Sequence, residues 1–225
     1  MSSGHWVGYI GNFQVNYDTL ITMWGAMAFI IVCSFLLTRN LQVIPTKWQA
    51  IAEKIMDFFL DALKEIKNGE KHIPLIGSLF LFILFANLMG QLPLKLFHLE
   101  QGEFASPTND LNMTAAMAIV VLVYYLYQAF KTKGIHSVYH GFSVTGIIET
   151  FIDFLDMITR PLSLSLRLFA NIYAGEILVA TLIALFPVIL PVPIMLFEIF
   201  VAFIQAYVFM MLSIAYINMS VSEEH

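Results

Sequence analysis

Residues 162–189 read LSLSLRLFANIYAGEILVATLIALFPVI. This stretch is almost wholly apolar and is long enough to cross a bilayer, yet it carries two charged side chains, Arg167 and Glu176, in its interior. Because arginine keeps its proton at any accessible pH, neutralisation cannot relieve its burial in hydrocarbon. A charge at the bilayer centre costs about 2.5 to 3.5 kcal/mol on insertion scales. We therefore interpret the stretch as a membrane helix and Arg167 as a candidate functional residue.

The composition of the whole chain places it in the membrane class. Hydrophobic residues make up 59% of the 225 residues and charged residues 12%, and the mean hydropathy is +0.79. Soluble domains contain about 45 to 50% hydrophobic residues and about 25% charged residues. The apolar runs lack the short alternation of barrel strands, so we expect each run to form a helix that satisfies its own backbone hydrogen bonds. The sequence predicts an all-α integral membrane protein in which residues 1–225 form a single membrane domain.

Three apolar runs predict simple transmembrane helices at residues 20–37, 73–96 and 112–130. The residues before the first run lack the features of a secretory signal, so we expect a retained polar tail. Residues 39–72 carry six Lys or Arg and two more lysines follow the third run, whereas residues 97–110 carry none. By the positive-inside rule, the basic loops face the cytoplasm or its organellar equivalent, and the N-terminus and residues 97–110 face outward.

Residues 46–68 predict an amphipathic surface helix instead of a span. At 100° per residue, most of its charged side chains fall on one side and Trp48, Ile51 and Ile55 fall on the other. We expect this helix to lie flat on the cytoplasmic surface of the membrane. Packing of its apolar face against a soluble partner is an alternative, and the two arrangements are compatible.

Residues 144–186 and 193–219 predict a long helical hairpin that departs from a simple bundle. Their apolar parts would each extend about 40 Å, against a hydrocarbon core of about 30 Å. The helices must therefore tilt, bend or lie nearly horizontal. Their polar residues also lie near the middle of each apolar stretch, so we expect the polar faces to meet protein or water.

The polar residues of the hairpin fall on separate faces. If the helix continues through Pro161, six polar side chains project within about 40° of Arg167: Glu149, Asp153, Asp156, Arg160, Ser163 and Asn171. Glu176 points to the opposite side, while Glu198, Gln205 and Tyr216 share one face of the last helix. This layout suits two ion paths that do not merge.

Structural explanations compete with a functional one at most of these positions. The amide and hydroxyl side chains of Asn171, Gln205 and Tyr216 could hydrogen-bond neighbouring helices. Glu176 and Glu198 could form structural ion pairs with lysines or be protonated bystanders, and Glu149, Asp153 and Asp156 could form a solvated face. Arg167 lies too far inside the apolar run for simple snorkelling to explain it.

Residues 163–176, SLSLRLFANIYAGE, resemble the signature of subunit a of F-type ATP synthases, the stator of the proton channel. Further matches are PTNDLNMT at residues 107–114, QAYVFM at residues 205–210 and SEEH at residues 222–225. The resemblance covers nearly the whole chain in order. It implies several membrane helices that end in a long, near-horizontal hairpin, which agrees with the excess length of the last two helices.

The resemblance also implies roles for particular residues. Arg167 would be the essential arginine that faces the rotor ring, Asn171, Glu176 and Gln205 would line the ion route, and Ser163 would lie toward the cytoplasmic half. Glu198 stands where some members carry His, so the outer path would pass between two carboxylates. Asp110 and Asn112 are weaker candidates for this outer path.

The implied partners are a ring of c-type proteolipid subunits that each carry a mid-membrane carboxylate, b-type subunits of the peripheral stalk, and lipid. We expect no nucleic-acid partner, no cofactor and no metal. The chain contains no phosphate-binding loop and no nucleophile with its base, so ATP chemistry would belong to other subunits. We expect the chain to lie in an energy-coupling membrane, namely the bacterial plasma membrane. Two rival functions are a standalone ion-coupled transporter, in which Arg167 binds an anionic substrate, and a purely structural membrane scaffold.

Overall fold

The computed structural model describes residues 7–10, 13–39, 41–66, 68–91, 107–133, 144–185 and 191–221. Almost all of these residues are helical. The long helices are α1 (Tyr17–Thr38), α3 (Ile73–Gln91), α4 (Leu111–Lys133), α5 (Val144–Leu185) and α6 (Pro191–Val221). The shorter elements are α2 (Lys47–Ala62) and two 3-10 turns, η1 (Gly69–His72) and η3 (Pro107–Asn109).

Five helices in the described part of the chain are long and apolar enough to cross a membrane. Their apolar segments are Thr19–Thr38, Gly69–Gly90, Leu111–Thr132, Gly146–Leu185 and Val192–Ser220. The predicted spans at residues 20–37 and 112–130 fall within α1 and α4. Helix α3 begins at the start of the predicted span 73–96, and residues 92–96 lie outside the described residues. Helices α5 and α6 contain the predicted hairpin, apart from residue 186, which also lies outside them.

The amphipathic helix predicted for residues 46–68 is shorter in the structure. Helix α2 begins after Thr46, whose hydroxyl oxygen accepts a hydrogen bond from the Gln49 amide, and it ends at Ala62. The chain then turns, because Asn68 takes a left-handed conformation (φ 59°) and Gly69 lies against the carbonyl oxygen of Leu63, where a side chain would not fit. This turn buries Leu63 and Ile66 in the core. These two residues, which were predicted to continue the helix, therefore contribute to core packing.

A β-hairpin precedes α1, where the sequence predicted only a polar tail. Strands β1 (Val7–Ile10) and β2 (Phe13–Asn16) pair antiparallel, with Val7 opposite Asn16. The side-chain amide of Asn16 donates a hydrogen bond of 3.0 Å to Asp110 Oδ2, so the end of this hairpin is tied to the start of α4.

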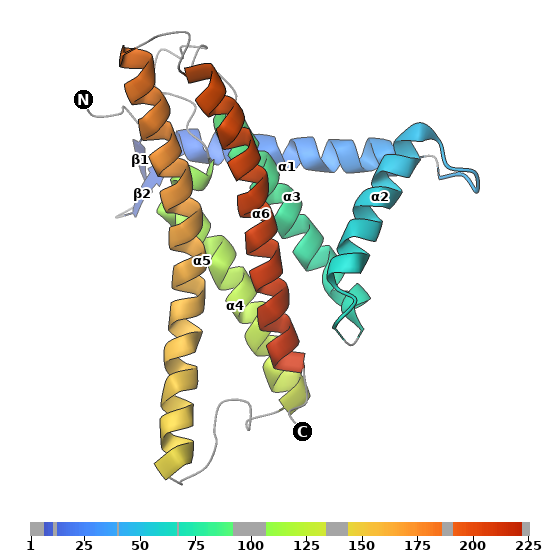
Figure 1. Ribbon diagram of the computed structural model, residues 1–225, viewed down its shortest axis with the longest axis vertical. Coiled ribbons are helices and arrows are strands. Elements are labelled where there is room, and N and C mark those ends of the chain that lie inside the picture. Colours follow the sequence, from blue (N-terminus) through green and yellow to red (C-terminus); the bar gives the residue numbers. More distant parts are fainter. Residues whose placement is uncertain are drawn as a thin grey trace.

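The core lies where α6 packs against α3 and α4, and α5 packs on α4 beside α6 (Figure 1). Helix α1 runs across the direction of the α5–α6 hairpin and packs mainly on α3 (Figure 1). His72 Nδ1 and the Tyr124 hydroxyl lie 2.8 Å apart and join the start of α3 to α4. The fully buried side chains at the centre of the core include Ile76, Ile83, Leu168, Met210 and Ile217.

Candidate functional site

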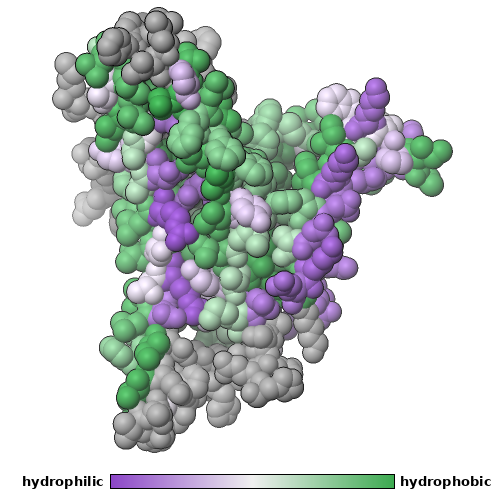
Figure 2. Space-filling view, viewed as in Figure 1, coloured by the Kyte–Doolittle hydropathy of each residue, from purple (hydrophilic) through white to green (hydrophobic). Residues whose placement is uncertain are grey.

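Arg167 lies on the exposed side of α5. The buried side of this helix lies about 100° around from Arg167, where Leu164, Leu168 and Ile172 pack against the rest of the protein. Arg167 itself is exposed, and among the residues that the structure describes no acidic side chain forms an ion pair with it. Figure 2 shows a narrow hydrophilic strip along α5, bordered by apolar surface. A permanent charge exposed in an almost wholly apolar segment points to a countercharge outside this chain.

Two of the predicted polar neighbours lie one helical turn from Arg167. Ser163 is exposed and Asn171 is half-buried, so both lie on the same side of α5 as the arginine. Helix α5 continues through Pro161, as the projection assumed. The side chains of Glu149 and Asp153 lie outside those that the structure describes. Around Arg167, this side of α5 therefore carries a hydroxyl, a guanidinium and an amide at four-residue spacing.

The two predicted carboxylates lie near one turn of α5, one on α5 itself and the other on α6. Glu176 is half-buried on α5, and its Oε2 accepts a hydrogen bond of 2.6 Å from the side-chain amide of Asn109 in η3. Glu198 on α6 is only 8% exposed, and it lies against Gly175, the residue before Glu176. A Cβ added at Gly175 would lie 2.7 Å from Glu198 Oε1. The glycine thus makes room for the second carboxylate.

Asp110 has a structural role that its sequence position did not reveal. One oxygen of its carboxylate accepts a hydrogen bond of 2.9 Å from the backbone amide of Asn112, which caps the start of α4. The other oxygen accepts the hydrogen bond from Asn16. Asn112 is exposed. The residue of this segment that reaches Glu176 is Asn109, which we did not single out, although the motif at residues 107–114 contains it.

Two buried amides add to the polar interior, one on α6 of the hairpin and one on α3. Gln205 is 7% exposed on α6, two turns after Glu198, as the sequence projection placed it. Asn87 on α3 is fully buried, and neither polar atom of its side chain has a hydrogen-bond partner among the described residues. Asn87 was not among the predicted site residues, although it is the only amide inside the apolar run that forms α3 before Gln91. A buried amide of this kind requires water or another polar partner.

Comparison with known proteins identifies the family. Residues 20–218 match the family model described as ATP synthase A chain. The family assignment is therefore settled: the chain belongs to the ATP synthase A chain family. A relative named ATP synthase subunit a, from Gloeobacter violaceus, is 42% identical over 225 aligned residues, which cover 98% of this chain and 90% of the relative.

As a member of the ATP synthase A chain family, the chain is a multi-pass membrane component of a proton-transporting complex that makes ATP. It is a component of that complex and not its catalytic subunit. The family resemblance drawn from residues 163–176 is thus confirmed, whereas the roles of individual residues remain predictions.

Proposed function

We propose that this chain is the stator subunit of the membrane sector, which forms two proton half-channels and presents Arg167 to a rotor ring. The observation that carries the proposal is the exposed guanidinium in the almost wholly apolar part of α5 that follows Pro161, without an acidic partner among the described residues. A ring of proteolipid subunits, each with one mid-membrane carboxylate, would supply the missing countercharge. The peripheral stalk would hold the stator still.

The mechanism follows from the electrostatics of a carboxylate in a membrane. A protonated carboxyl group is neutral and tolerates lipid, but an ionised one requires a countercharge. Arg167 provides that countercharge only where the ring meets α5. A ring carboxyl that arrives there releases its proton into one half-channel, passes the arginine as an anion, and is reprotonated from the other half-channel. Rotation is thereby coupled to proton flow, and the fixed cation repels protons that would leak directly between the two paths.

The outer half-channel of this proposal runs past Glu176 and past Glu198, which lies against Gly175, the residue before Glu176. The hydrogen bond from Asn109 holds one oxygen of Glu176 in place and adds an amide to the path. The half-buried Asn171 and the buried Gln205 extend the polar route toward the ring. Asp110 and Asn112 lie at the outer end, where Asp110 mainly caps α4. The inner half-channel runs along the Ser163 side of α5.

We infer the membrane orientation from helix direction and loop charge. Helices α1, α3 and α4 would span the bilayer, α2 would lie on the cytoplasmic surface, and the α5–α6 hairpin would lie oblique or nearly horizontal. Figure 1 supports this arrangement for α1, which runs across the direction of the hairpin, whereas α3 and α4 run closer to the hairpin's direction. The hydrophilic band over α2 supports the surface position of that helix (Figure 2). The basic loops would face the cytoplasm of a bacterial plasma membrane.

Replacement of Arg167 tests the proposal. We expect Arg167→Ala to abolish ATP synthesis and ATP-driven proton pumping in membrane vesicles while passive proton conduction persists, because the countercharge and the barrier are both lost. Ser78→Ala, at an exposed position on α3, is the control and should pump normally. Wild-type ATP synthesis in the Arg167→Ala membranes would refute the proposed gate.

Reconstitution separates the proposal from the rival functions. A standalone transporter would move a solute when this chain alone is placed in liposomes, whereas a stator without its ring should move little. A structural scaffold would tolerate Arg167→Gln with full pumping, whereas a gate would not, because glutamine carries no countercharge.

A further inference from the structure

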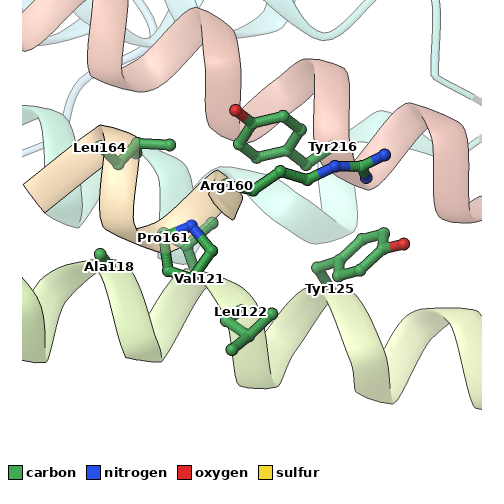
Figure 3. Close-up of a pocket in the computed structure, with 8 residues that line it drawn as sticks. All are labelled: Ala118, Val121, Leu122, Tyr125, Arg160, Pro161, Leu164 and Tyr216. Atoms are coloured by element: carbon green, nitrogen blue, oxygen red, sulfur yellow. The ribbon is translucent and has the colours of Figure 1, made fainter. Parts of the chain in front are cut away.

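A second arginine of the hairpin, Arg160, lies inside the protein instead of on the polar strip. Its side chain is only 16% exposed. The guanidinium lies over two aromatic rings, 5.5 Å from the ring centre of Tyr125 on α4 and 5.2 Å from that of Tyr216 on α6. Figure 3 shows the guanidinium between the two rings, so one side chain of α5 contacts both neighbouring helices at once.

An ion pair on α5 itself completes this arrangement. Arg160 Nη2 lies 2.9 Å from Asp156 Oδ2, one helical turn earlier. The Asp156 side chain is 48% exposed, so this ion pair alone would contribute little. The two cation–π contacts are stronger because the guanidinium is largely desolvated. A small cavity of about 10 Å³ lies beside the arginine and is lined in part by apolar side chains that include Val121 and Leu164.

The place of these contacts along α5 gives them a consequence for the proposed gate. Pro161 follows Arg160 directly, and it has no amide hydrogen, so the helix lacks one backbone hydrogen bond there. Such a position is where a long helix bends most easily. The segment that carries Arg167 begins immediately afterwards. A bend at Pro161 would therefore shift the guanidinium of Arg167 relative to α4 and α6, and hence relative to the ring.

We propose that Arg160 is a positioning residue: held by the rings of Tyr125 and Tyr216, it fixes α5 beside its proline and thereby fixes Arg167 at the rotor interface. Lysine could keep the charge and the ion pair with Asp156, but it lacks the planar group that stacks on both rings. This inference rests on the proposed function only for its effect on pumping. Its effect on the geometry of α5 can be measured independently.

The test uses the assembled ATP synthase with spin labels on two exposed positions, Val123 on α4 and Ile183 on α5, in a Cys33→Ser background. Position 183 lies beyond the proline and about 160° around the helix from Arg167, away from the ring interface. Pulsed electron paramagnetic resonance gives the distribution of distances between the two labels. Only assembled complexes are measured, so a variant that does not assemble contributes no signal.

The matched variants are Tyr216→Phe, which keeps the ring, and Tyr216→Leu, which removes it. We expect Tyr216→Phe to keep the wild-type distance distribution and the wild-type ratio of protons pumped to ATP hydrolysed. Tyr216→Leu should raise the displaced population about tenfold, as expected for the loss of one desolvated cation–π contact, and should lower the pumping ratio. Arg160→Gln should have the same effects, and Arg160→Lys should be intermediate.

Two results would overturn the inference. The first is a wild-type distance distribution in both Tyr216→Leu and Arg160→Gln. The second is an equal disturbance by Tyr216→Phe and Tyr216→Leu, which would assign the effect to the hydroxyl group. Failure of the proposed function would look different, because Arg167→Ala would then pump protons while the distances in the Tyr216 variants still changed.

Discussion

Gly175→Ala is the substitution that tests the outer carboxylates most directly. The new Cβ would lie 2.7 Å from Glu198 Oε1 and 3.2 Å from its carboxyl carbon. The oxygen contact is about 0.8 Å shorter than the optimal separation of non-bonded heavy atoms, so one of the two groups must move. The Glu198 carboxyl group is the end of a flexible side chain, whereas the new Cβ is fixed to a helix backbone. We therefore expect the carboxyl group to move and the fold to survive.

This displacement should reduce proton flux without preventing assembly. A misplacement of about 1 Å in a reacting group can lower a rate by about a hundredfold, so we expect ATP-driven pumping to fall between tenfold and a hundredfold. The assay is pumping by inverted membrane vesicles, normalised to the amount of assembled complex. Helix propensity works in the opposite direction, because alanine stabilises a helix by roughly 0.5 to 1 kcal/mol relative to glycine.

Two further variants make the test decisive. Gly25→Ala, where the nearest atom to the new Cβ is Met89 Cε at 3.8 Å, controls for the gain in helix propensity and should pump normally. Glu198→Asp shortens the acidic side chain by one methylene group, so the Gly175→Ala/Glu198→Asp pair should pump better than Gly175→Ala alone. Normal pumping by Gly175→Ala would show that the position of the Glu198 carboxylate does not limit proton flow.

The remaining predictions concern the carboxylates and their amide partner. Glu176→Gln should slow proton flux with assembly intact, because an amide cannot take up and release a proton; a variant that merely fails to assemble would favour a structural role. Glu198→His, the alternative that the family resemblance implies, should keep at least partial synthesis of ATP, and complete loss in an assembled complex would show a different relay. Asn109→Leu removes the hydrogen bond to Glu176 and should lower flux, whereas Asn109→Ser should retain part of it; equal flux in both variants would assign no role to this bond.

The sequence alone predicted the elements that depend on local chemistry. Apolar runs of sufficient length predicted the helices, because a segment in hydrocarbon must satisfy its own backbone hydrogen bonds. The same reasoning singled out Arg167, since a permanent charge inside such a run has no structural explanation within the run itself. The predicted end of the amphipathic helix, at residue 68, was wrong. The turn at Asn68 and Gly69 ends the helical region earlier, and this turn depends on close packing against Leu63.

Contacts between distant parts of the chain were decided only by the tertiary structure. Helical projection assigned Arg160 to the same line as Arg167. In the structure, however, the long side chain of Arg160 turns inward and its guanidinium contacts two tyrosines from other helices. The contact of Asn109 with Glu176 and the place of Glu198 beside Gly175 also depend on how distant segments pack together. Hydrophobicity and charge act on each residue where it stands in the chain, so the sequence determines which segments enter the membrane. Hydrogen bonds and ring contacts act only over a few ångströms, so the packing of the helices determines which polar groups meet.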